Sequence, residues 1–281
     1  MSGSLQDLKQ YIGRSETAED VVTASQVGRL AAALDLDHSA PNEGDPVPTG
    51  WHNVFCPRWS KSGCCATTGS RRGRHHSAGG AAETRAGGRR RNIQGCHRIG
   101  DRLTKVTEVA DIVIDEDETH PNVLVTVRET YSSARGVAVV EDRGFRYLGE
   151  NGPAARPDPP SVPDRAAWSR TYPSDAAMMF RLSAVRYNTH RVHYDRDYTT
   201  KVEGLPGLVV PLSLVSALML EQCRANAPGR KMESFVYRSV KRVFDLGPFS
   251  VMGALDGGKA TLWATDYEGD LAVLAEVGFS D

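Results

Sequence analysis

The most apolar part of the chain lies between residues 205 and 220, shortly before a long second group of alternating segments. Residues 212 to 223 are apolar nearly all round, a pattern that a helix tolerates only when other structure encloses it. Pro211 suits the first turn of such a helix. The stretch is interrupted by proline, glycine and serine and is shorter than the roughly 20 apolar residues of a membrane-spanning helix. We therefore expect a buried core helix.

Segments rich in β-branched residues, separated by polar turns, form one group before this helix and one group after it. The expected strands are 106–114, 123–130 and 137–140 in the first group and 233–243, 249–255, 260–266 and 271–277 in the second. A short enclosed helix followed by an antiparallel meander is typical of a sheet wrapped around that helix. The pattern predicts an α+β protein with a double hot-dog fold, in which two antiparallel sheets each wrap around a central helix.

The first part of the chain has a helical pattern of apolar residues. They recur at Val27, Leu30, Ala31 and Leu34, and the acidic residues that precede them suit a first helical turn. Ser15 and Thr17 are the expected N-caps. This predicts a helix with one apolar face, followed by a loop rich in Pro, Gly and Asp over residues 35–50.

A stretch rich in proline and glycine, residues 149–163, divides the chain. Its prolines cannot donate the backbone hydrogen bonds that a sheet needs, so its composition is that of a linker. The expected organisation is an N-terminal hot-dog domain over 1–150, a linker over 151–174 and a C-terminal hot-dog domain over 175–281.

The segment between Arg58 and Arg98 has an anomalous composition. It holds ten basic residues and a single acid, Glu83, among many glycines and alanines, and it shows neither helical nor strand periodicity. A basic arm for nucleic acid and a solvated loop are two interpretations. A third is that residues 64–96 are translated out of frame, and we favour it over the basic arm. In each case we expect residues from about 64 to 96 to be poorly ordered or irregular and to contribute little to the core.

Composition narrows the class of protein. Of the 281 residues, 34 are basic and 35 acidic, and a net charge of −1 provides no field that would attract nucleic acid or an anionic membrane. The N-terminus has no basic region followed by an apolar one, so no secretory signal is expected. Five cysteines without a Cys-x-x-Cys pair fit neither a disulfide framework nor a structural zinc site. These features favour a cytoplasmic enzyme that acts on a small molecule.

One short segment concentrates chemically useful side chains directly upstream of the apolar helix. Within eight residues it carries Asn188, His190, Arg191, His193, Tyr194 and Asp195. Histidine titrates near neutral pH, and a neighbouring carboxylate such as Asp195 can orient it or raise its basicity, so general acid–base catalysis is one interpretation. A hydrogen-bonded polar strand end is another. A metal site lacks further ligands at suitable spacing, so no metal is expected.

The start of the apolar helix offers a complementary feature. Pro206-Gly207 and the helix start at Pro211-Leu212 present free backbone N–H groups and the positive end of a helix dipole. A thioester oxygen that gains negative charge would be stabilised there. A simple turn at Pro-Gly is the alternative.

With these residues in view, the chain resembles the MaoC-like hydratase/dehydratase superfamily of hot-dog enzymes. The similarity is greatest to a two-domain branch with mesaconyl-CoA and itaconyl-CoA hydratases and the mitochondrial 3-hydroxyacyl-thioester dehydratase. The residues that carry the resemblance are Tyr11 to Glu16, Thr23 to Asp35, Gly50-Trp51-His52, Arg98 to Asp101, Val125 to Arg128, Val139 to Glu141, Phe180 to Asp195, Val202 to Val210 and Leu262 to Ala264.

The resemblance implies roles for the polar segment. The superfamily motif is Asp-x-Asn-Pro-x-His, with the Asp and His as the catalytic pair, and here Asn188 stands in place of the acid while His193 is retained. It implies that His193 transfers the proton and that Asn188 orients water or substrate. His190 and Asp195 complete the expected catalytic set, and the expected substrate contacts are Arg191, Tyr194, Gly207, Val210 and Leu212.

One position departs from the branch. Its members usually have Val-Val-His-Gly before the central helix, whereas this chain has Val209-Val210-Pro211-Leu212, which replaces the glycine expected to bring a backbone amide close to the thioester. One alternative is therefore a catalytically impaired hot-dog protein that still binds acyl-CoA.

The expected function is reversible hydration of an enoyl-CoA with a short branched dicarboxylic acyl group, such as mesaconyl-CoA or itaconyl-CoA. The alternative within the enzymes is dehydration of 3-hydroxyacyl thioesters in fatty-acid synthesis. The CoA thioester is the substrate, and no cofactor or metal is expected. Neither nucleic acid nor membrane is an expected partner, and a homodimer is one arrangement that the sequence permits.

Overall fold

The computed structural model describes residues 5–37, 41–57, 84–116, 121–148 and 160–280. The helical elements are η1 (Leu5–Tyr11), α1 (Ala24–Ala33), η2 (Trp51–Val54), α2 (Ala176–Val185), η4 (Arg191–His193), α3 (Arg196–Lys201) and α4 (Leu212–Asn226). The strands are β1 (Ser15–Val21), β2 (Thr84–Ile93), β3 (Arg102–Asp115), β4 (Asn122–Ser133), β5 (Gly136–Leu148), β6 (Trp168–Tyr172), β7 (Lys231–Ser239), β8 (Phe249–Asp256), β9 (Lys259–Thr265) and β10 (Leu271–Ser280).

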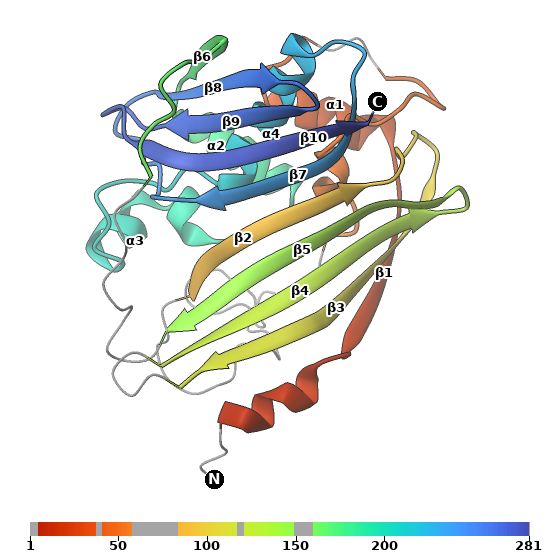
Figure 1. The fold of residues 1–281 in the computed structure, drawn as a ribbon, viewed down its shortest axis with the longest axis horizontal. Coiled ribbons are helices and arrows are strands. Elements are labelled where there is room, and N and C mark those ends of the chain that lie inside the picture. The colour runs from red at the N-terminus through yellow and green to blue at the C-terminus, as the bar shows by residue number, and fades with distance from the viewer. Residues whose placement is uncertain (1–4, 38–40, 58–83, 117–120, 149–159, 281) are drawn as a thin grey trace.

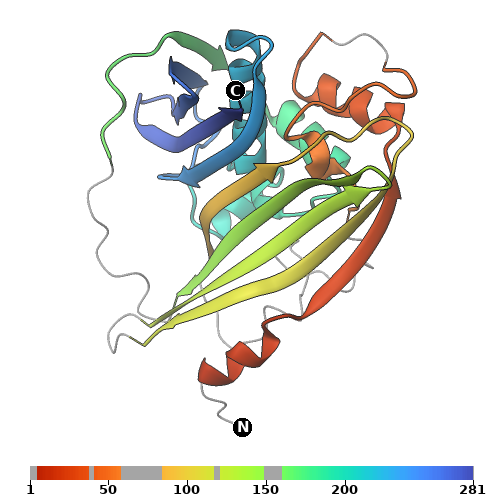
Figure 2. The ribbon, with the colours of Figure 1, turned by 45° about the vertical axis from the view of Figure 1, so that its right-hand side comes forward.

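The ten strands form one sheet in the order β1-β3-β4-β5-β2-β7-β10-β9-β8-β6. Strand β2 pairs with β5 on one side and with β7 on the other, both antiparallel, so it joins the two halves of the chain. Figures 1 and 2 show α1, α2 and α4 on one face of this sheet. The predicted α+β hot-dog fold is confirmed, with the sheets of the two halves continuous through the β2–β7 pair.

Helix α4 is the enclosed helix that the sequence predicted. Nearly every residue from Ser213 to Cys223 is buried, and the strands that follow it curve around it. Pro211 precedes the first turn, where its missing N–H is not needed. Helix α4 therefore contributes apolar surface on all its sides to the core. No helix in the described ranges is long and apolar enough to cross a membrane.

The first helix begins later than predicted. The expected caps at Ser15 and Thr17 are wrong, because residues 15–21 form β1, which pairs along its whole length with β3. Thr23 is the N-cap of α1: its hydroxyl accepts the N–H of Gln26, and the Gln26 side chain accepts the N–H of Thr23. The apolar face through Val27, Leu30 and Ala31 is buried as expected.

The anomalous basic segment is only partly described. Residues 84–93 form strand β2, in which Arg91 and Ile93 are buried, so the expectation of an irregular segment with little part in the core is wrong there. Strand periodicity was hidden because alternate positions carry arginines rather than apolar residues. Residues 58–83 lie outside the described residues, and translation out of frame stays a hypothesis.

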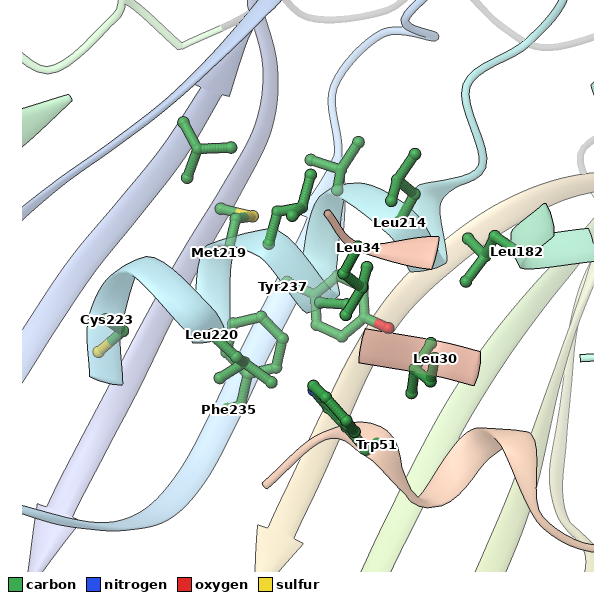
Figure 3. Close-up of a cluster of buried hydrophobic side chains, with 14 of the residues drawn as sticks. Leu30, Leu34, Trp51, Leu182, Leu214, Met219, Leu220, Cys223, Phe235 and Tyr237 are labelled. Atoms are coloured by element: carbon green, nitrogen blue, oxygen red, sulfur yellow. The ribbon is translucent and has the colours of Figure 1, made fainter. Parts of the chain in front are cut away.

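The main core is built from both halves of the chain. Figure 3 shows Leu30 and Leu34 of α1 and Trp51 of η2 beside Leu220 of α4 and Phe235 of β7. All are almost completely buried, in one apolar cluster. Burial of apolar surface stabilises a fold by roughly 25 cal/mol per Å². Because both halves bury side chains in this one core, the stability of each half depends on the other. The division into domains at 150 and 174 stays a prediction, and β6 lies within the predicted linker and pairs with β8.

Candidate functional site

The polar segment begins where α2 ends, and the chain turns sharply there. The N–H of Tyr187 bonds the carbonyl of Ala184, and the N–H of Asn188 bonds the carbonyl of Ser183. This is the Schellman arrangement, which requires a left-handed residue and usually has glycine at that position. Here Tyr187 takes it, with φ of 52°. A non-glycine residue in this region stores about 1 kcal/mol of strain. The turn directs Asn188 and the following residues back toward the body of the protein.

Asn188 fixes the next part of the segment through its side chain. Its Oδ1 accepts the backbone N–H of His190 at 3.3 Å. This local bond is typical of asparagine in turns. The Asn188 side-chain NH₂ group remains as a donor, which suits a role in orienting water or a substrate oxygen.

His193 is held by the strand that leads into α4. Its Nδ1 lies 2.8 Å from the carbonyl oxygen of Val209, so Nδ1 carries the hydrogen and donates it. The lone pair is then on Nε2, which has no hydrogen-bond partner among the described residues. Burial, together with the charge of Arg186 and the neighbouring His190, lowers the pKa of His193 to about 4, although the bond to Val209 raises it. His193 is therefore neutral at pH 7 and can accept a proton at Nε2.

His190 and His193 meet edge to face, with ring centroids 5.3 Å apart. Burial also lowers the pKa of His190, against the opposing effect of Glu203. Both rings are thus neutral near pH 7, so there is no charge repulsion between them at that pH. The structure places the ring of His190 against that of His193, and Asn188 bonds the backbone of His190, while the catalytic roles of the three stay predictions.

Asp195 and Arg191 have a different position from the one expected. Asp195 caps α3 by accepting the N–H of Tyr198 at 3.0 Å, and it pairs with Arg191 at 2.7 Å. The Arg191 guanidinium lies over the Tyr198 ring. The expectation that Asp195 orients or activates a histidine is wrong, because the Val209 carbonyl occupies Nδ1 of His193 and the carboxylate is committed to the cap. The hydroxyl of Tyr194 donates to the carbonyl of Thr189, which braces the same turn.

The start of α4 lies beside His193, since Val209 is three residues from the first helical residue, Leu212. The N–H groups of Val209 and Val210 are already bonded, to Val192 and Val243. Pro211 has no N–H, so the first amides without a bonded partner in the part of the chain that the structure describes are those of Leu212 and Ser213. The Leu212 side chain packs against the main core. Gly207 is buried where a Cβ would lie 2.6 Å from a carboxylate oxygen of Asp245, so packing favours glycine there, and its expected contact with substrate stays a prediction.

A second feature was not predicted from the sequence: a charged band across the helix-covered face of the sheet. It consists of Lys105, Glu129, Glu141, Arg143, Arg89 and Arg91. Their strands are β3, β4, β5 and β2. Arg91 is 1% exposed and bonds Glu141 at 2.9 Å. Sequence periodicity could not reveal the band, because its residues come from four strands and each looks like a solvent-facing charge.

Two neighbours extend this charged band. His52 of η2 lies 3.0 Å from Glu141, and the hydroxyl of Tyr237 on β7 accepts a hydrogen bond from Arg91 at 2.9 Å. Burial raises the pKa of Glu129, but Arg143 and Lys105 outweigh it and bring the value to about 2. Burial also raises the pKa of Glu141, but Arg91 and His52 outweigh it and hold that pKa well below its usual range, so both carboxylates are ionised near neutral pH.

Arg186 connects the polar segment with the charged band. It is the C-cap of α2, two residues before Asn188. Its Nε is enclosed and has no hydrogen-bond partner among the described residues. Burial and the charges of Arg143 and Arg89 lower the pKa of Arg186 to about 10. Sequence reasoning did not select this residue, although it lies next to the motif that it did select.

Two further groups lie elsewhere. A cavity of about 10 Å³, room for one water molecule, is lined by residues that include His52, Cys96 and His97, and none of its lining comes from the polar segment. The buried Asp266 clusters with the exposed Glu268 and Asp270. Lys241 pairs with all three, so this acidic group is already neutralised in part.

Comparison with known sequences identifies relatives of this chain. A model of the family hydroxyacyl-thioester dehydratase type 2 matches residues 50–245. The mesaconyl-C(4)-CoA hydratase of Chloroflexus aurantiacus is 30% identical over 273 residues, which cover 96% of this chain and 97% of that protein. The mitochondrial hydroxyacyl-thioester dehydratase type 2 of Schizosaccharomyces pombe is 30% identical over 148 residues, which are 51% of this chain and 47% of that protein.

Solved structures confirm the fold. A MaoC-like dehydratase from Phytophthora capsici superposes with a TM-score of 0.72 at 14% identity, covering 97% of both chains. A Mycobacterium tuberculosis protein described as having a double hot-dog fold has a TM-score of 0.55 at 12% identity, covering 96% of both chains.

The fold and the matches define the class of protein as a hot-dog hydratase/dehydratase that acts on acyl thioesters. Within that class, the chain belongs to the hydroxyacyl-thioester dehydratase type 2 family. The resemblance to MaoC-like enzymes that the sequence indicated is thereby confirmed.

Proposed function

We propose that this chain catalyses reversible hydration of an enoyl-CoA whose acyl group is short, branched and dicarboxylic, such as mesaconyl-CoA or itaconyl-CoA. The observation that carries the proposal is the similarity to mesaconyl-C(4)-CoA hydratase along nearly the full length of both chains. A neutral, oriented His193 beside the start of α4 supports the chemistry.

In the proposed mechanism, Nε2 of His193 accepts a proton from water as the water oxygen bonds to the β-carbon. The π electrons of the double bond shift toward the thioester. The α-carbon then takes up a proton as protonated His193 releases the one that it accepted, so the net change is the addition of one water molecule. The free amides of Leu212 and Ser213 stabilise the charge on the enolate-like oxygen. Asn188 donates from its NH₂ group to water or substrate, and His190 lines the site. No cofactor or metal takes part in this proposal.

Dehydration of 3-hydroxyacyl thioesters in fatty-acid synthesis is the second candidate. It is favoured by the family model and by the similarity to the S. pombe dehydratase, which covers about half of each chain. It is the same chemistry in the reverse direction on a longer, uncharged acyl group. The dicarboxylic substrate is preferred because the similarity to the hydratase extends over both halves.

The test is a hydration assay with a panel of enoyl-CoA thioesters. The loss of the enoyl absorbance measures the rate. The proposal expects mesaconyl-CoA or itaconyl-CoA to give a kcat/KM well above those of crotonyl-CoA and a long-chain enoyl-CoA. A preference for the long-chain substrate would favour the second candidate. Absence of turnover with every thioester, despite measurable binding, would favour an impaired acyl-CoA-binding protein. Sedimentation of the same preparation would show whether it is a homodimer.

A further inference from the structure

The charged band and Arg186 together contain more positive than negative charge. Four cations of the band, Lys105, Arg89, Arg91 and Arg143, share two carboxylates, Glu129 and Glu141. Arg186 adds a fifth cation, which interacts electrostatically with Arg143 and Arg89. No hydrogen bond or ion pair to its guanidinium occurs within the described residues. Glu141 offsets part of this repulsion, but a largely buried cation without a direct ion pair is still costly, so a site of this kind favours an anion.

Unused donors mark where that anion would lie. The Nε atoms of Arg186 and Arg143 are enclosed and lack hydrogen-bond partners among the described residues. An arginine fork binds a carboxylate through two parallel hydrogen bonds, which makes it the preferred partner for such a group. The imbalance does not depend on the anomalous basic segment, since Arg186, Arg143 and Lys105 alone outnumber the two carboxylates.

The location relates this excess charge to the reaction. Arg186 lies two residues before Asn188. Its positive charge contributes to the lowered pKa of His193. In a mesaconyl thioester, which has a four-carbon backbone and a methyl branch, the free carboxylate is bonded directly to the β-carbon. A group that binds this carboxylate must therefore lie beside the base that activates water. A long apolar acyl chain, by contrast, would bring no counter-charge to Arg186.

We propose that Arg186, supported by Arg143, binds the free carboxylate of the substrate's acyl group and thereby selects dicarboxylic over uncharged acyl-CoA thioesters. This inference rests on the proposed function, because it assumes that the acyl group enters between the polar segment and the charged band. It identifies Arg186 as a specificity-determining residue.

The experiment measures binding with saturated thioesters, so that it does not depend on turnover. Succinyl-CoA and butyryl-CoA both have four-carbon acyl groups and differ in the terminal carboxylate. Calorimetry on the wild-type protein should give a dissociation constant for succinyl-CoA that is roughly 10- to 100-fold lower, the usual effect of a hydrogen bond to a charged group. Arg186→Gln should remove this preference by weakening succinyl-CoA alone. Arg186→Lys, which keeps the charge without the fork, should retain part of it.

Arg181→Gln is the matched control. Arg181 is exposed on the same helix, and its substitution removes one positive charge, as Arg186→Gln does. It should keep the wild-type preference. A wild-type protein with no preference for succinyl-CoA overturns the inference without any variant. Equal weakening of both thioesters by Arg186→Gln also overturns it, since the arginine would then bind a phosphate of CoA. A clear preference together with no hydration of any enoyl-CoA would contradict the proposed function and leave the carboxylate site standing.

Discussion

At the scale of single residues, the tautomer of His193 is the central fact. The bond from Nδ1 to Val209 leaves Nε2 as the acceptor, which a general base requires. If His193 is the base, His193→Ala should lower turnover by roughly 100-fold or more with little change in substrate affinity or folding. His190→Ala should have a smaller effect on turnover. Turnover and thermal midpoint of both variants provide the measurement.

A structural role for His193 gives the opposite pattern. Truncation of a buried, hydrogen-bonded imidazole lowers stability and reduces activity only in proportion to the loss of folded protein. A His193→Ala protein that melts early but keeps near-normal activity per folded molecule would contradict the catalytic assignment.

The pKa of His193 leads to a prediction for the pH profile. The folded value is about 4, below the ordinary value of 6.5, so the base stays unprotonated down to mildly acidic pH. The acid limb of kcat/KM should therefore lie near pH 4 rather than near 6.5. The same shift means that this residue destabilises the fold as pH falls from 6.5 toward 4, because only the unfolded chain then takes up the proton. Initial rates and thermal midpoints across this range test both statements, and an acid limb at 6.5 would exclude His193 as the titrating base.

At the scale of elements, the end of α2 determines where the polar segment lies. Tyr187 holds the left-handed position that closes this helix, with φ of 52°. Tyr187→Gly should be more stable than Tyr187→Ala by about 1 kcal/mol, because both remove the ring but only glycine removes the backbone strain. Urea unfolding of the two variants measures this difference. An alanine variant as stable as the glycine variant would mean that the turn stores no strain.

At the scale of the whole molecule, the charged band couples stability to pH. Glu129 is buried, and its pKa of about 2 is below the ordinary value of 4.5. Its ion pairs with Lys105 and Arg143 are therefore fully stabilising above pH 4.5 and are lost as pH falls from 4.5 toward 2. Glu129→Gln should cost about 3 to 5 kcal/mol at pH 7, since it leaves buried cations unpaired. The variant's free energy of unfolding should also fall less steeply between pH 4.5 and pH 2 than that of the wild type.

Asp142→Asn is the control for this prediction. Asp142 is on the neighbouring strand and pairs with Arg128, whose side chain is 47% exposed. Removal of such an exposed pair should cost at most about 1 kcal/mol. Equal losses for the two variants, measured by urea unfolding at pH 7, would show that the band contributes no special stability.

The sequence by itself determined the elements whose side chains alternate or repeat regularly. The apolar run 212–223 could only be an enclosed helix, and the β-branched segments could only be strands, because local periodicity reports which face is buried. The motif around Asn188, His190 and His193 was also evident, since its residues are neighbours in the chain. The family followed from the same motif.

The tertiary structure alone decided what depends on pairing between distant segments. Strand β2 was missed because its buried Arg91 has partners that are remote in sequence. Glu141 on β5 forms an ion pair with it, and the hydroxyl of Tyr237 on β7 accepts a hydrogen bond from it. Asp195 was assigned to a histidine because the cap of α3 and the Val209 carbonyl could not be foreseen from spacing. Arg186 gained its importance only when the fold brought it to two other arginines. The periodicity of a segment indicates which of its side chains are buried, but not which residues of other segments they contact. Electrostatic interactions depend on those contacting residues.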